Sequence, residues 1–432
     1  MSEPAANSAG IRTTKSMIKD VVMIGTGAAS GQAIVMLFSP LLTRLYDVEA
    51  FGVFGMFSAI VASIGTLSSL RFEQAILIEK DDEGAGEVLR LCVSVVSAIT
   101  LLSFVGFIIA NFFPMRSIYG QLVPMLIEYG AANILVLGVF SGLYGWFTRA
   151  GSFRTLGIYQ FSRSAIGVAL QLIFCLFGHD ARFLIAGQTV GLVAALLLIV
   201  GVGRPRTLPV LLARYRLDAL SVMARRYKTF PLYGAPQTLV RMLSQNMPAL
   251  LLPIFFGAAQ SGLFWLAYRI LILPSQIVVE STRGVLFRDL GALHRNGADL
   301  RRAMARPALY LGALSGSVAI LLFFFGPFLF GLVFGSHWQE SGRYAAILSV
   351  AWTVENAGMP AAVVISLLEL QRVYLAVEIL SLIARVVALY IGSRFHSAEL
   401  GIELYVVASV AASAANMSYV WWVLSRRSRR VP

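Results

Sequence analysis

Long apolar stretches, each followed by a short polar segment, recur from one end of this chain to the other. A helix needs about 20 largely apolar residues to cross the hydrocarbon layer of a membrane. Twelve stretches come near or exceed that length, and together they predict an all-α polytopic membrane protein. The expected spans are 21–43, 51–78, 89–113, 122–147, 156–178, 182–203, 230–256, 261–287, 306–334, 342–368, 373–395 and 400–424.

The seventh stretch differs from the others because polar and helix-breaking residues interrupt it. Arg241, Gln245 and Asn246 lie inside it, together with three prolines. A charge at mid-membrane depth is costly unless it faces a partner or a watery cavity. Backbone groups freed by proline also need protein or water to satisfy them. We therefore expect this helix to line a polar cavity.

The beginning of the chain repeats the pattern of the seventh stretch. The spacing from glutamine to proline is identical in the two copies, and a glycine and a phenylalanine follow in each. The matched residues are Gln32, Pro40, Gly52 and Phe54 in the first copy and Gln245, Pro253, Gly262 and Phe264 in the second. Repeats around a polar centre are common in transporters. We expect two pseudo-symmetric six-helix bundles around a central cavity, at 1–203 and 230–432, joined by a cytoplasmic linker at 204–229.

The composition agrees with a membrane protein. Hydrophobic residues make up 58% of the 432 residues and charged residues 13%, against roughly 25% charged residues in soluble domains. The net charge of +13 would suit nucleic acid, but nearly all charges lie in short segments between apolar stretches. We therefore expect membrane lipids, and not nucleic acid, around this chain.

The 35 lysines and arginines indicate the orientation. With the N-terminus in the cytoplasm, most of them fall in cytoplasmic segments, among which Arg163 is counted. The opposite loops hold only Arg44, Arg116, Arg182, Arg343 and Arg394. Because basic residues favour the cytoplasmic side, both termini are expected there. The first cytoplasmic loop is acidic, although acidic residues carry little weight in this rule: Glu79, Asp81, Asp82, Glu83 and Glu87.

The linker at 204–229 has an apolar face and a basic face. This pattern is typical of a basic amphipathic helix on the inner membrane surface, and a solvated linker is the alternative. The apolar positions are Leu208, Leu211, Leu212, Tyr215, Leu220 and Met223.

Five local patterns follow one another along the chain. They are SPLLTRLYDVEAFGVFGMF at 39–57, LRFEQAILIEKDDE at 70–83, YKTFPLYGAPQTLVRMLSQNMPALLLPIFFG at 227–257, GLFWLAYRILILPSQIV at 262–278 and FGSHWQESGRYAAIL at 334–348. None is specific by itself. In this order and spacing they resemble the Wzx-like polysaccharide and O-antigen flippases of the multidrug/oligosaccharidyl-lipid/polysaccharide exporter superfamily. The resemblance covers nearly the whole chain.

The resemblance implies a V-shaped bundle that works by alternating access, with a cavity lined mainly by the first, second, seventh and eighth spans. It implies a multi-pass protein of the bacterial inner membrane, not an enzyme. The cargo would be an undecaprenyl-diphosphate-linked oligosaccharide of O-antigen, capsule or exopolysaccharide type, moved to the outer leaflet. Expected partners are this lipid-linked oligosaccharide, a proton or sodium gradient, and polysaccharide polymerase or chain-length proteins.

The chemistry of such a cargo selects the candidate binding residues. Arginine binds phosphate through a planar fork of donors, and amides suit sugar hydroxyls. For each arginine the alternative is a role in pairing with another protein group. Arg71 has Glu73 nearby, and its side chain can also extend to the inner membrane interface. The candidates are Arg71, Arg241, Arg269, Gln32, Gln245 and Asn246.

Two lone carboxylates, Glu128 and Glu355, lie in the fourth and tenth spans. A buried glutamate can carry a proton at physiological pH, so both are candidates for proton coupling. The alternative is that each locks onto Arg241, Arg385 or a backbone group. Glu378 and Arg385, seven residues apart on one helical face, are expected to hold helices together.

Other functions stay open at this point. A cation-coupled drug exporter belongs to the same superfamily, although arginines in the seventh and eighth spans do not suit cationic drugs. A membrane glycosyltransferase, polymerase or ligase commonly needs a large outside loop, and a non-transporting scaffold leaves Arg241 unexplained. The histidines are scattered and Cys92 and Cys175 lie in apolar stretches, so we expect neither a metal site nor a cofactor.

Overall fold

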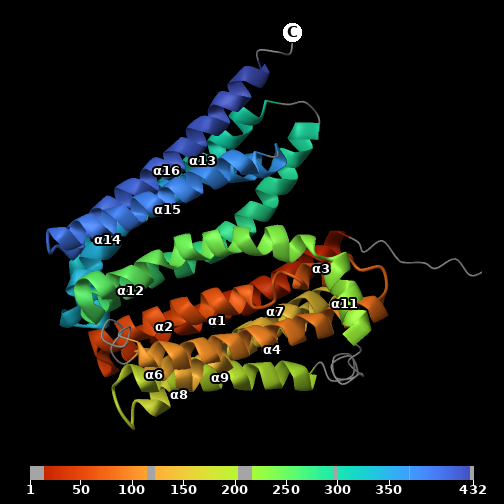
Figure 1. Ribbon diagram of the computed structural model, residues 1–432. Coiled ribbons are helices and arrows are strands. Elements are labelled where there is room, and N and C mark those ends of the chain that lie inside the picture. Colours follow the sequence, from red (N-terminus) through yellow and green to blue (C-terminus); the bar gives the residue numbers. More distant parts are fainter. Residues whose placement is uncertain (1–13, 114–121, 203–216, 296–298, 369, 429–432) are drawn as a thin grey trace, which may run out of the picture.

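The computed structural model describes residues 14–113, 122–202, 217–295, 299–368 and 370–428, and the regular structure in these ranges is helical throughout (Figure 1). The first helices are α1 (Thr14–Leu45), α2 (Val48–Leu67), α3 (Glu73–Ile78), α4 (Asp82–Phe112), α6 (Leu122–Met125), η1 (Leu126–Gly130), α7 (Ala131–Arg149), α8 (Phe153–Phe174) and α9 (Ala181–Val202). They are followed by α11 (Leu217–Arg226), η2 (Phe230–Gly234), α12 (Ala235–Arg295), α13 (Leu300–Phe334), η3 (Ser336–Trp338), α14 (Gln339–Leu367), α15 (Gln371–Arg394) and α16 (Ala398–Ser428).

The predicted membrane-spanning class is confirmed. Nine helical segments in the described ranges are long and apolar enough to cross a membrane. Two further predicted spans, 21–43 and 156–178, coincide with α1 and α8, which are not among the nine. The predicted span 261–287 is not counted separately because it continues α12. The helices therefore agree roughly with the twelve expected spans.

Helix α12 contains two of the predicted spans and breaks between them. Gly257 has φ +88° and ψ 168°, which is not a helical conformation. Glycine adopts positive φ without the steric cost of a Cβ atom. The break therefore separates a first segment, Ala235–Phe256, from a second segment, Ala258–Arg295, close to where the sequence predicts the boundary.

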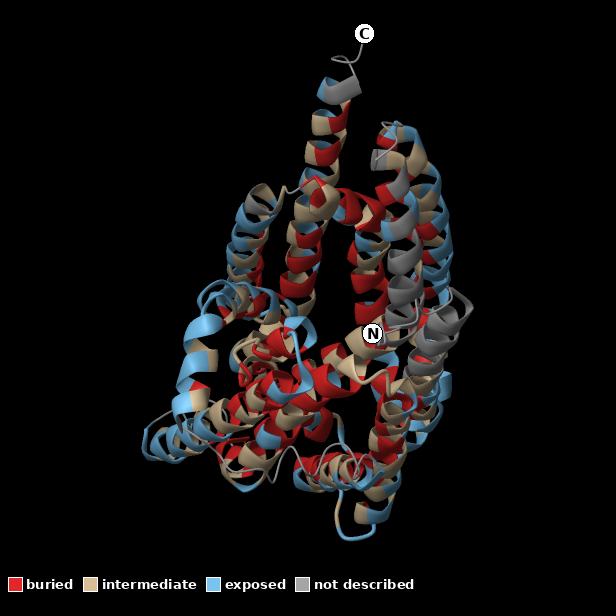
Figure 2. Cartoon of the chain, turned by 90° about the vertical axis from the view of Figure 1, so that its right-hand side faces the viewer, coloured by how far each residue is buried: buried red, intermediate tan, exposed pale blue. Residues whose placement is uncertain are grey.

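Two groups of helices meet at one end of the molecule and have separate cores at the other (Figure 1). One hydrophobic core, the joint core, takes buried residues from both groups, including Phe51, Phe54, Leu263, Phe264 and Trp338. A second core belongs to α3, α4, α7, α8, α9 and α11, and a third to the end of α12 with α13, α14 and α16. Figure 2 shows exposed residues along the outer faces of both groups.

A close backbone contact between the two groups uses the glycines of the sequence repeat. Gly52 on α2 and Gly262 on α12 lie against each other, so a Cβ atom on Gly52 would lie 1.9 Å from the carbonyl oxygen of Ala258. A Cβ atom on Gly262 would lie 2.0 Å from the carbonyl oxygen of Val48. The repeated glycine therefore supplies both sides of one backbone contact.

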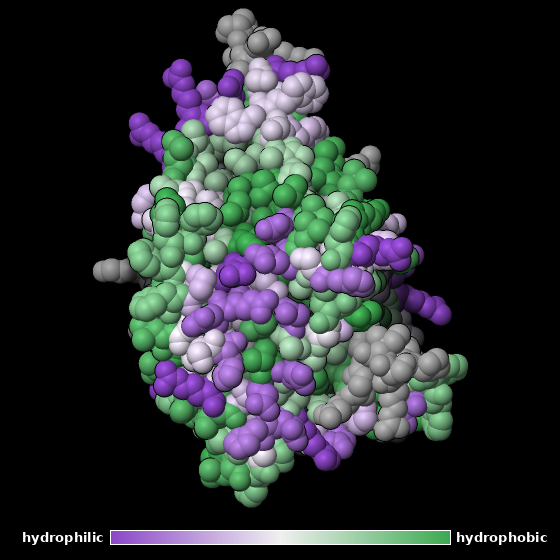
Figure 3. Space-filling view, turned by 90° about the vertical axis from the view of Figure 1, so that its left-hand side faces the viewer, coloured by the Kyte–Doolittle hydropathy of each residue, from purple (hydrophilic) through white to green (hydrophobic). Residues whose placement is uncertain are grey.

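Hydrogen bonds join the groups at this same end. Thr43 of α1 donates to the carbonyl of Phe334 over 3.3 Å, and the Trp338 indole donates to the carbonyl of Thr43 over 2.9 Å. Arg44 donates to the carbonyl of Leu332 over 3.2 Å. Viewed from this end, the surface carries a central band of hydrophilic residues with hydrophobic flanks (Figure 3). The two groups are therefore closed against each other here.

The linker helix α11 packs against protein. Leu220 and Tyr227 are buried in the core of the first group, and Met223 packs against it. Part of the predicted amphipathic segment, 204–216, lies outside the described residues. In the described part, apolar residues of α11 cover the N-terminal end of α4, while Val222 stays exposed.

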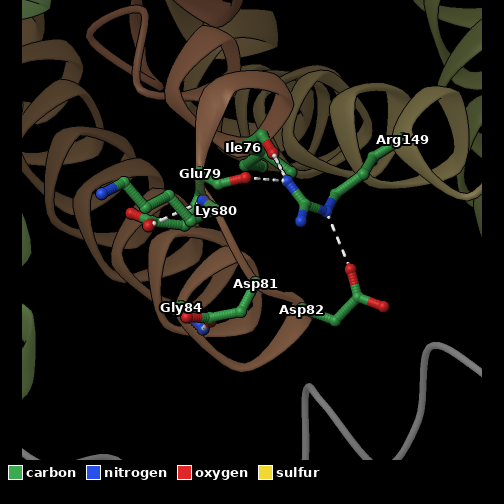
Figure 4. A network of polar contacts seen from close by, with 7 residues as sticks. All are labelled: Ile76, Glu79, Lys80, Asp81, Asp82, Gly84 and Arg149. Atoms are coloured by element: carbon green, nitrogen blue, oxygen red, sulfur yellow. Dashed lines mark hydrogen bonds and ion pairs between the residues drawn. The ribbon is translucent and has the colours of Figure 1, made fainter. Parts of the chain in front are cut away.

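The acidic first loop is ordered by local contacts (Figure 4). Arg149 of α7 donates to the carbonyl oxygens of Ile76 and Glu79 and pairs with Asp82 at 2.9 Å. Asp81 caps α4 by accepting from the Gly84 amide over 2.6 Å. The carboxylate of Glu79 is almost completely buried, accepts from the Tyr227 hydroxyl and pairs with Arg226 at 3.2 Å. The loop therefore fastens α11 to the first group.

Replacing Tyr227 with Phe should loosen α11 without unfolding the protein. The Tyr227 hydroxyl is the main reason that the pKa of Glu79 is held below its usual range, ahead of the Lys80 amide and Arg226. A hydrogen bond to a charged group contributes roughly 1.5–3 kcal/mol. Maleimide labelling of a cysteine introduced at buried Leu220 should therefore become at least tenfold faster in Tyr227→Phe.

The same contact gives a pH dependence. The pKa of Glu79 is lower in the folded protein than in the unfolded chain. Its contribution to the stability of the α11 contact is therefore complete above the unfolded pKa of about 4.3, and it is lost as the pH falls through the folded pKa. Labelling at position 220 by 4,4′-dithiodipyridine, which still reacts with thiols in acid, should rise relative to an exposed control cysteine only below about pH 4. Unchanged labelling in Tyr227→Phe at neutral pH would show that the hydrogen bond from Tyr227 to Glu79 does not hold the helix.

Candidate functional site

Two cavities adjoin different faces of the second segment of α12. A cavity of about 230 Å³ in the first group, the N-terminal cavity, is reached from α12 by Arg269. A cavity of about 330 Å³ in the second group, the C-terminal cavity, is lined by the preceding residue, Tyr268. The expected central cavity is thus represented by two spaces that adjoin the same helix.

The N-terminal cavity is polar and positively charged. Two arginines line it, Arg269 from α12 and Arg163 from α8, and none of its described lining residues is acidic. Amides and hydroxyls complete the polar wall: Ser58, Ser164, Gln171 and Gln188. The amide of Gln171 is partly used, since it donates to the carbonyl of Leu184 over 3.1 Å. Two guanidinium groups without a carboxylate form a site suited to an anion, above all a phosphate.

The C-terminal cavity has a different balance of charge. Glu355, Glu378 and Arg385 line it, together with four aromatic residues: Tyr268, Trp352, Tyr374 and Tyr405. The Glu355 side chain is 51% exposed although it lies among transmembrane helices, because it faces this space. With two carboxylates and one guanidinium, the C-terminal cavity does not favour an anion.

Arg385 is held by a network that connects four helices. Its guanidinium donates to Ser409 over 3.0 Å and to Ser244 over 2.8 Å, and it lies 3.8 Å from Glu378. Ser244 donates in turn to Glu378. The predicted role of Glu378 and Arg385 in holding helices together is therefore confirmed, with partners on α12 and α16. Glu355 is 3.9 Å from Arg385, one of the partners that the sequence offered for it.

Arg241 and Gln245 lie one turn apart on α12 and are both exposed. Gln245 lines the C-terminal cavity, and Arg241, one turn before it, is not among the described residues that line it. No salt bridge joins Arg241 to a carboxylate of the described chain. Arg241 is therefore accessible and free to bind an anion, but it is not enclosed as Arg269 is.

The other two amides from the repeat have different positions. Asn246 donates to Ser63 of α2 over 3.2 Å and to the carbonyl of Met242 over 3.1 Å, so it bridges the groups. Gln32 is partly buried one turn from Val35, a residue that lines the N-terminal cavity. Gln32 itself is not among the described residues lining either cavity.

Arg71 lies away from both cavities. It pairs with Glu73 at 3.2 Å, next to the η2 residue Gly234. Its φ of +66° and that of Leu70, +46°, turn the chain sharply between α2 and α3. These contacts fit the structural alternative for Arg71, at the end of its helix, and bring it to no binding site.

Glu128 has a partner that the sequence did not suggest. Arg182 of α9 binds both of its carboxylate oxygens, at 3.0 and 2.7 Å. A bidentate pair of this kind ties η1 to α9 and occupies both oxygens of the carboxylate. Of the two glutamates predicted for proton coupling, Glu355 alone faces a cavity.

Arg163 is the main residue of the site that the sequence reasoning missed. It was counted with the cytoplasmic segments, yet it lies inside the predicted span 156–178. Three further polar residues of that span, Gln160, Ser164 and Gln171, recur at three- to four-residue and seven-residue intervals. This polar stripe on α8 was the available signal for a cavity.

Comparisons with known proteins agree with this architecture. A family model described as "Polysaccharide biosynthesis protein" matches residues 41–343. The succinoglycan biosynthesis transport protein ExoT of Rhizobium meliloti (strain 1021) is 20% identical over 324 residues, or 72% of this chain. The match spans 61% of the length of that relative.

Solved structures with the same fold are transporters. An inward-facing MATE family multidrug resistance transporter of the MOP superfamily has a TM-score of 0.66, with 16% identity over 98% of both chains. A MOP superfamily transporter from Pyrococcus furiosus has a TM-score of 0.65 at 16% identity over 96% of this chain and 99% of its own. The Vibrio cholerae MATE transporter VcmN has a TM-score of 0.59, with 16% identity over 96% of this chain and 97% of its own. At this identity the likeness shows the fold alone.

Proposed function

Because the chain belongs to the polysaccharide biosynthesis protein family and resembles a succinoglycan biosynthesis transport protein, we propose that it flips a lipid-linked oligosaccharide across the bacterial inner membrane. The cargo is an undecaprenyl-diphosphate-linked repeat unit of O-antigen, capsule or exopolysaccharide type. Both termini lie in the cytoplasm, and the two six-helix bundles, 1–203 and 230–432, alternate in access. The polyprenyl tail stays in the lipid.

The observation that carries this proposal is that Arg163 and Arg269 line the same cavity. Their shared cavity has no acidic residue among its described lining, so its positive charge is uncompensated there. The diphosphate carries the negative charge of the cargo, and this charge needs a positively charged partner when the diphosphate leaves water. Charge-assisted, bidentate bonds from guanidinium groups supply that compensation.

The closed end of the molecule fits one step of the transport cycle. Arg44 and Arg343 lie in predicted outer loops, and Arg44 bonds across the groups at the closed end. With that orientation, the structure corresponds to a state open to the cytoplasm, where the lipid-linked cargo is made available. Energy would come from a proton or sodium gradient, for which Glu355 is the candidate residue.

A translocation assay tests the proposal. The lipid-linked oligosaccharide that accumulates in a strain lacking this protein would be placed in the outer leaflet of vesicles, with and without the purified protein. We expect the protein to equilibrate the cargo between the leaflets. Cargo that stays in one leaflet under every imposed proton or sodium gradient would contradict the flippase function.

A cation-coupled exporter of organic cations is the second candidate. The observation in its favour is the half-exposed Glu355 among four aromatic rings in the C-terminal cavity. Arg163 and Arg269 speak against it, because they would repel a cation from the N-terminal cavity. Uptake of tetraphenylphosphonium by the same vesicles, without movement of the lipid-linked cargo, would favour the exporter. A glycan polymerase or ligase has no comparable supporting observation.

Replacing Arg241 with Ala should lower export about fivefold while the protein still inserts and accumulates. Arg241 is exposed, so the contribution of its charge is smaller than that of an enclosed arginine, on the order of 1 kcal/mol. Export by vesicles and the amount of protein in membranes give the two readouts. Arg302→Ala, at an exposed residue outside the cavities, is the matched control. Normal export by Arg241→Ala would remove Arg241 from the cargo path.

A further inference from the structure

The C-terminal cavity has the properties of a carbohydrate site. On the basis of the proposed function, we propose that it binds a sugar unit of the oligosaccharide while the diphosphate binds at Arg163 and Arg269. The two cavities adjoin the same helix, since Tyr268 lines one and Arg269 the other.

The size and walls of the C-terminal cavity suit a sugar ring. Its volume of about 330 Å³ is at the lower end of the roughly 300–1,000 Å³ of small-molecule pockets. Tyr268, Trp352, Tyr374 and Tyr405 line it from three helices and the second segment of α12. Aromatic side chains combine a flat apolar face with a polar edge, which matches the apolar faces and hydroxyl rim of a pyranose.

The charges in this cavity exclude a phosphate and favour hydroxyl groups. Arg385 is only 10% exposed and is engaged by Glu378, Ser244 and Ser409. The charge open to a ligand is the half-exposed carboxylate of Glu355. A carboxylate repels phosphate but accepts short, strong bonds from hydroxyl donors. Gln245, also exposed at this cavity, adds both a donor and an acceptor.

Two polar atoms at the cavity wall lack partners within the described chain. They are Nε1 of Trp352 and Oδ1 of Asn416, one a donor and the other an acceptor. Both are closed to water, and a buried polar group without a hydrogen bond is destabilising. A hydroxyl group donates and accepts at once, so a sugar can satisfy both atoms after a small rotation of either side chain.

The test separates the sugar from the phosphate. Translocation of the lipid-linked oligosaccharide from a deletion strain is measured in vesicles, and binding of undecaprenyl diphosphate without sugar is measured on the purified protein. For Trp352→Ala and Asn416→Ala we expect translocation to fall at least tenfold while undecaprenyl diphosphate binds as before. Trp352→Phe, which keeps a ring, should retain most activity. Trp422→Ala, at an exposed tryptophan of α16 outside the cavity, should be unaffected.

Each other outcome overturns the inference. Normal translocation by Trp352→Ala and Asn416→Ala, with a functional wild-type protein, would show that no sugar binds there. If these variants also lost the binding of undecaprenyl diphosphate, the C-terminal cavity would not be specific for the sugar. If tetraphenylphosphonium bound in this cavity and the sugar did not, the cavity would be a cation site. Failure of the wild-type protein to move the cargo would instead refute the proposed function itself.

Discussion

Replacing Arg269 with Ala should reduce translocation of the lipid-linked cargo by at least thirtyfold and weaken the binding of undecaprenyl diphosphate to the same extent. Truncating one partner of a buried charge pair costs roughly 2–5 kcal/mol, and 2 kcal/mol corresponds to about thirtyfold. Arg269 enters a cavity whose described lining holds no carboxylate. Its removal therefore leaves Arg163 as the only lining cation among the described residues.

The replacement Arg269→Lys refines this prediction. Lysine keeps the charge but lacks the planar fork, so we expect an intermediate loss. Arg163→Ala should act in the same direction. If both arginines hold one diphosphate, the double variant should lose less than the product of the single effects, because neighbouring residues on one ligand are coupled. Arg302→Ala provides a matched loss of charge at an exposed site. Normal binding of undecaprenyl diphosphate by Arg269→Ala would contradict the phosphate site.

Replacing Gly262 with Ala should lower the thermal stability of the purified protein and stop translocation. The new Cβ atom would lie 2.0 Å from the carbonyl oxygen of Val48, so α2 and α12 must separate. Overpacking a core costs typically 1–3 kcal/mol, and here the obstacle is backbone that cannot rotate away. Gly52→Ala should have the same effect, since its Cβ atom would lie 1.9 Å from the carbonyl oxygen of Ala258.

The control for this prediction is another helical glycine. A Cβ atom on Gly106 of α4 would meet nothing within 4 Å. Gly106→Ala should leave the unfolding temperature unchanged or raise it, because alanine favours a helix by about 1 kcal/mol over glycine. Measurements in detergent and in vesicles would compare the three variants. A wild-type unfolding temperature together with wild-type translocation in Gly262→Ala would show that the two groups do not need this contact.

The sequence indicates the helices and the repeat because both depend on local composition. Runs of apolar residues mark the spans, and the matched Gly52 and Gly262 mark a contact, although only the structure shows that they touch each other. The break in α12 follows from glycine and proline near residue 257. Glu378 and Arg385 could be paired because they share one face of one helix.

The contacts that the sequence does not specify depend on neighbours distant in the sequence. Arg163 looked like part of a cytoplasmic segment until α8 packed beside α1 and α9 and brought it to Arg269. Asn246 has the chemistry of a sugar ligand but is used by Ser63 on another helix. Glu128 is paired with Arg182, 54 positions further along. Such pairings follow from helix packing, which hydropathy and spacing do not specify.

The Gly52–Gly262 contact lies near one end of α2, so a small tilt at this contact produces a larger displacement at the other end of the helix. A helix of 20 residues is about 30 Å long, and α2 has that length. From Gly52 to the end of α2 at Leu67 the helix spans about 22 Å, so a tilt at Gly52 moves that end by roughly 0.4 Å for each degree. A change of ten degrees at the glycines would thus displace the far end of α2 by about 4 Å. Small changes in fit at the crossing are in this way magnified where cargo would enter.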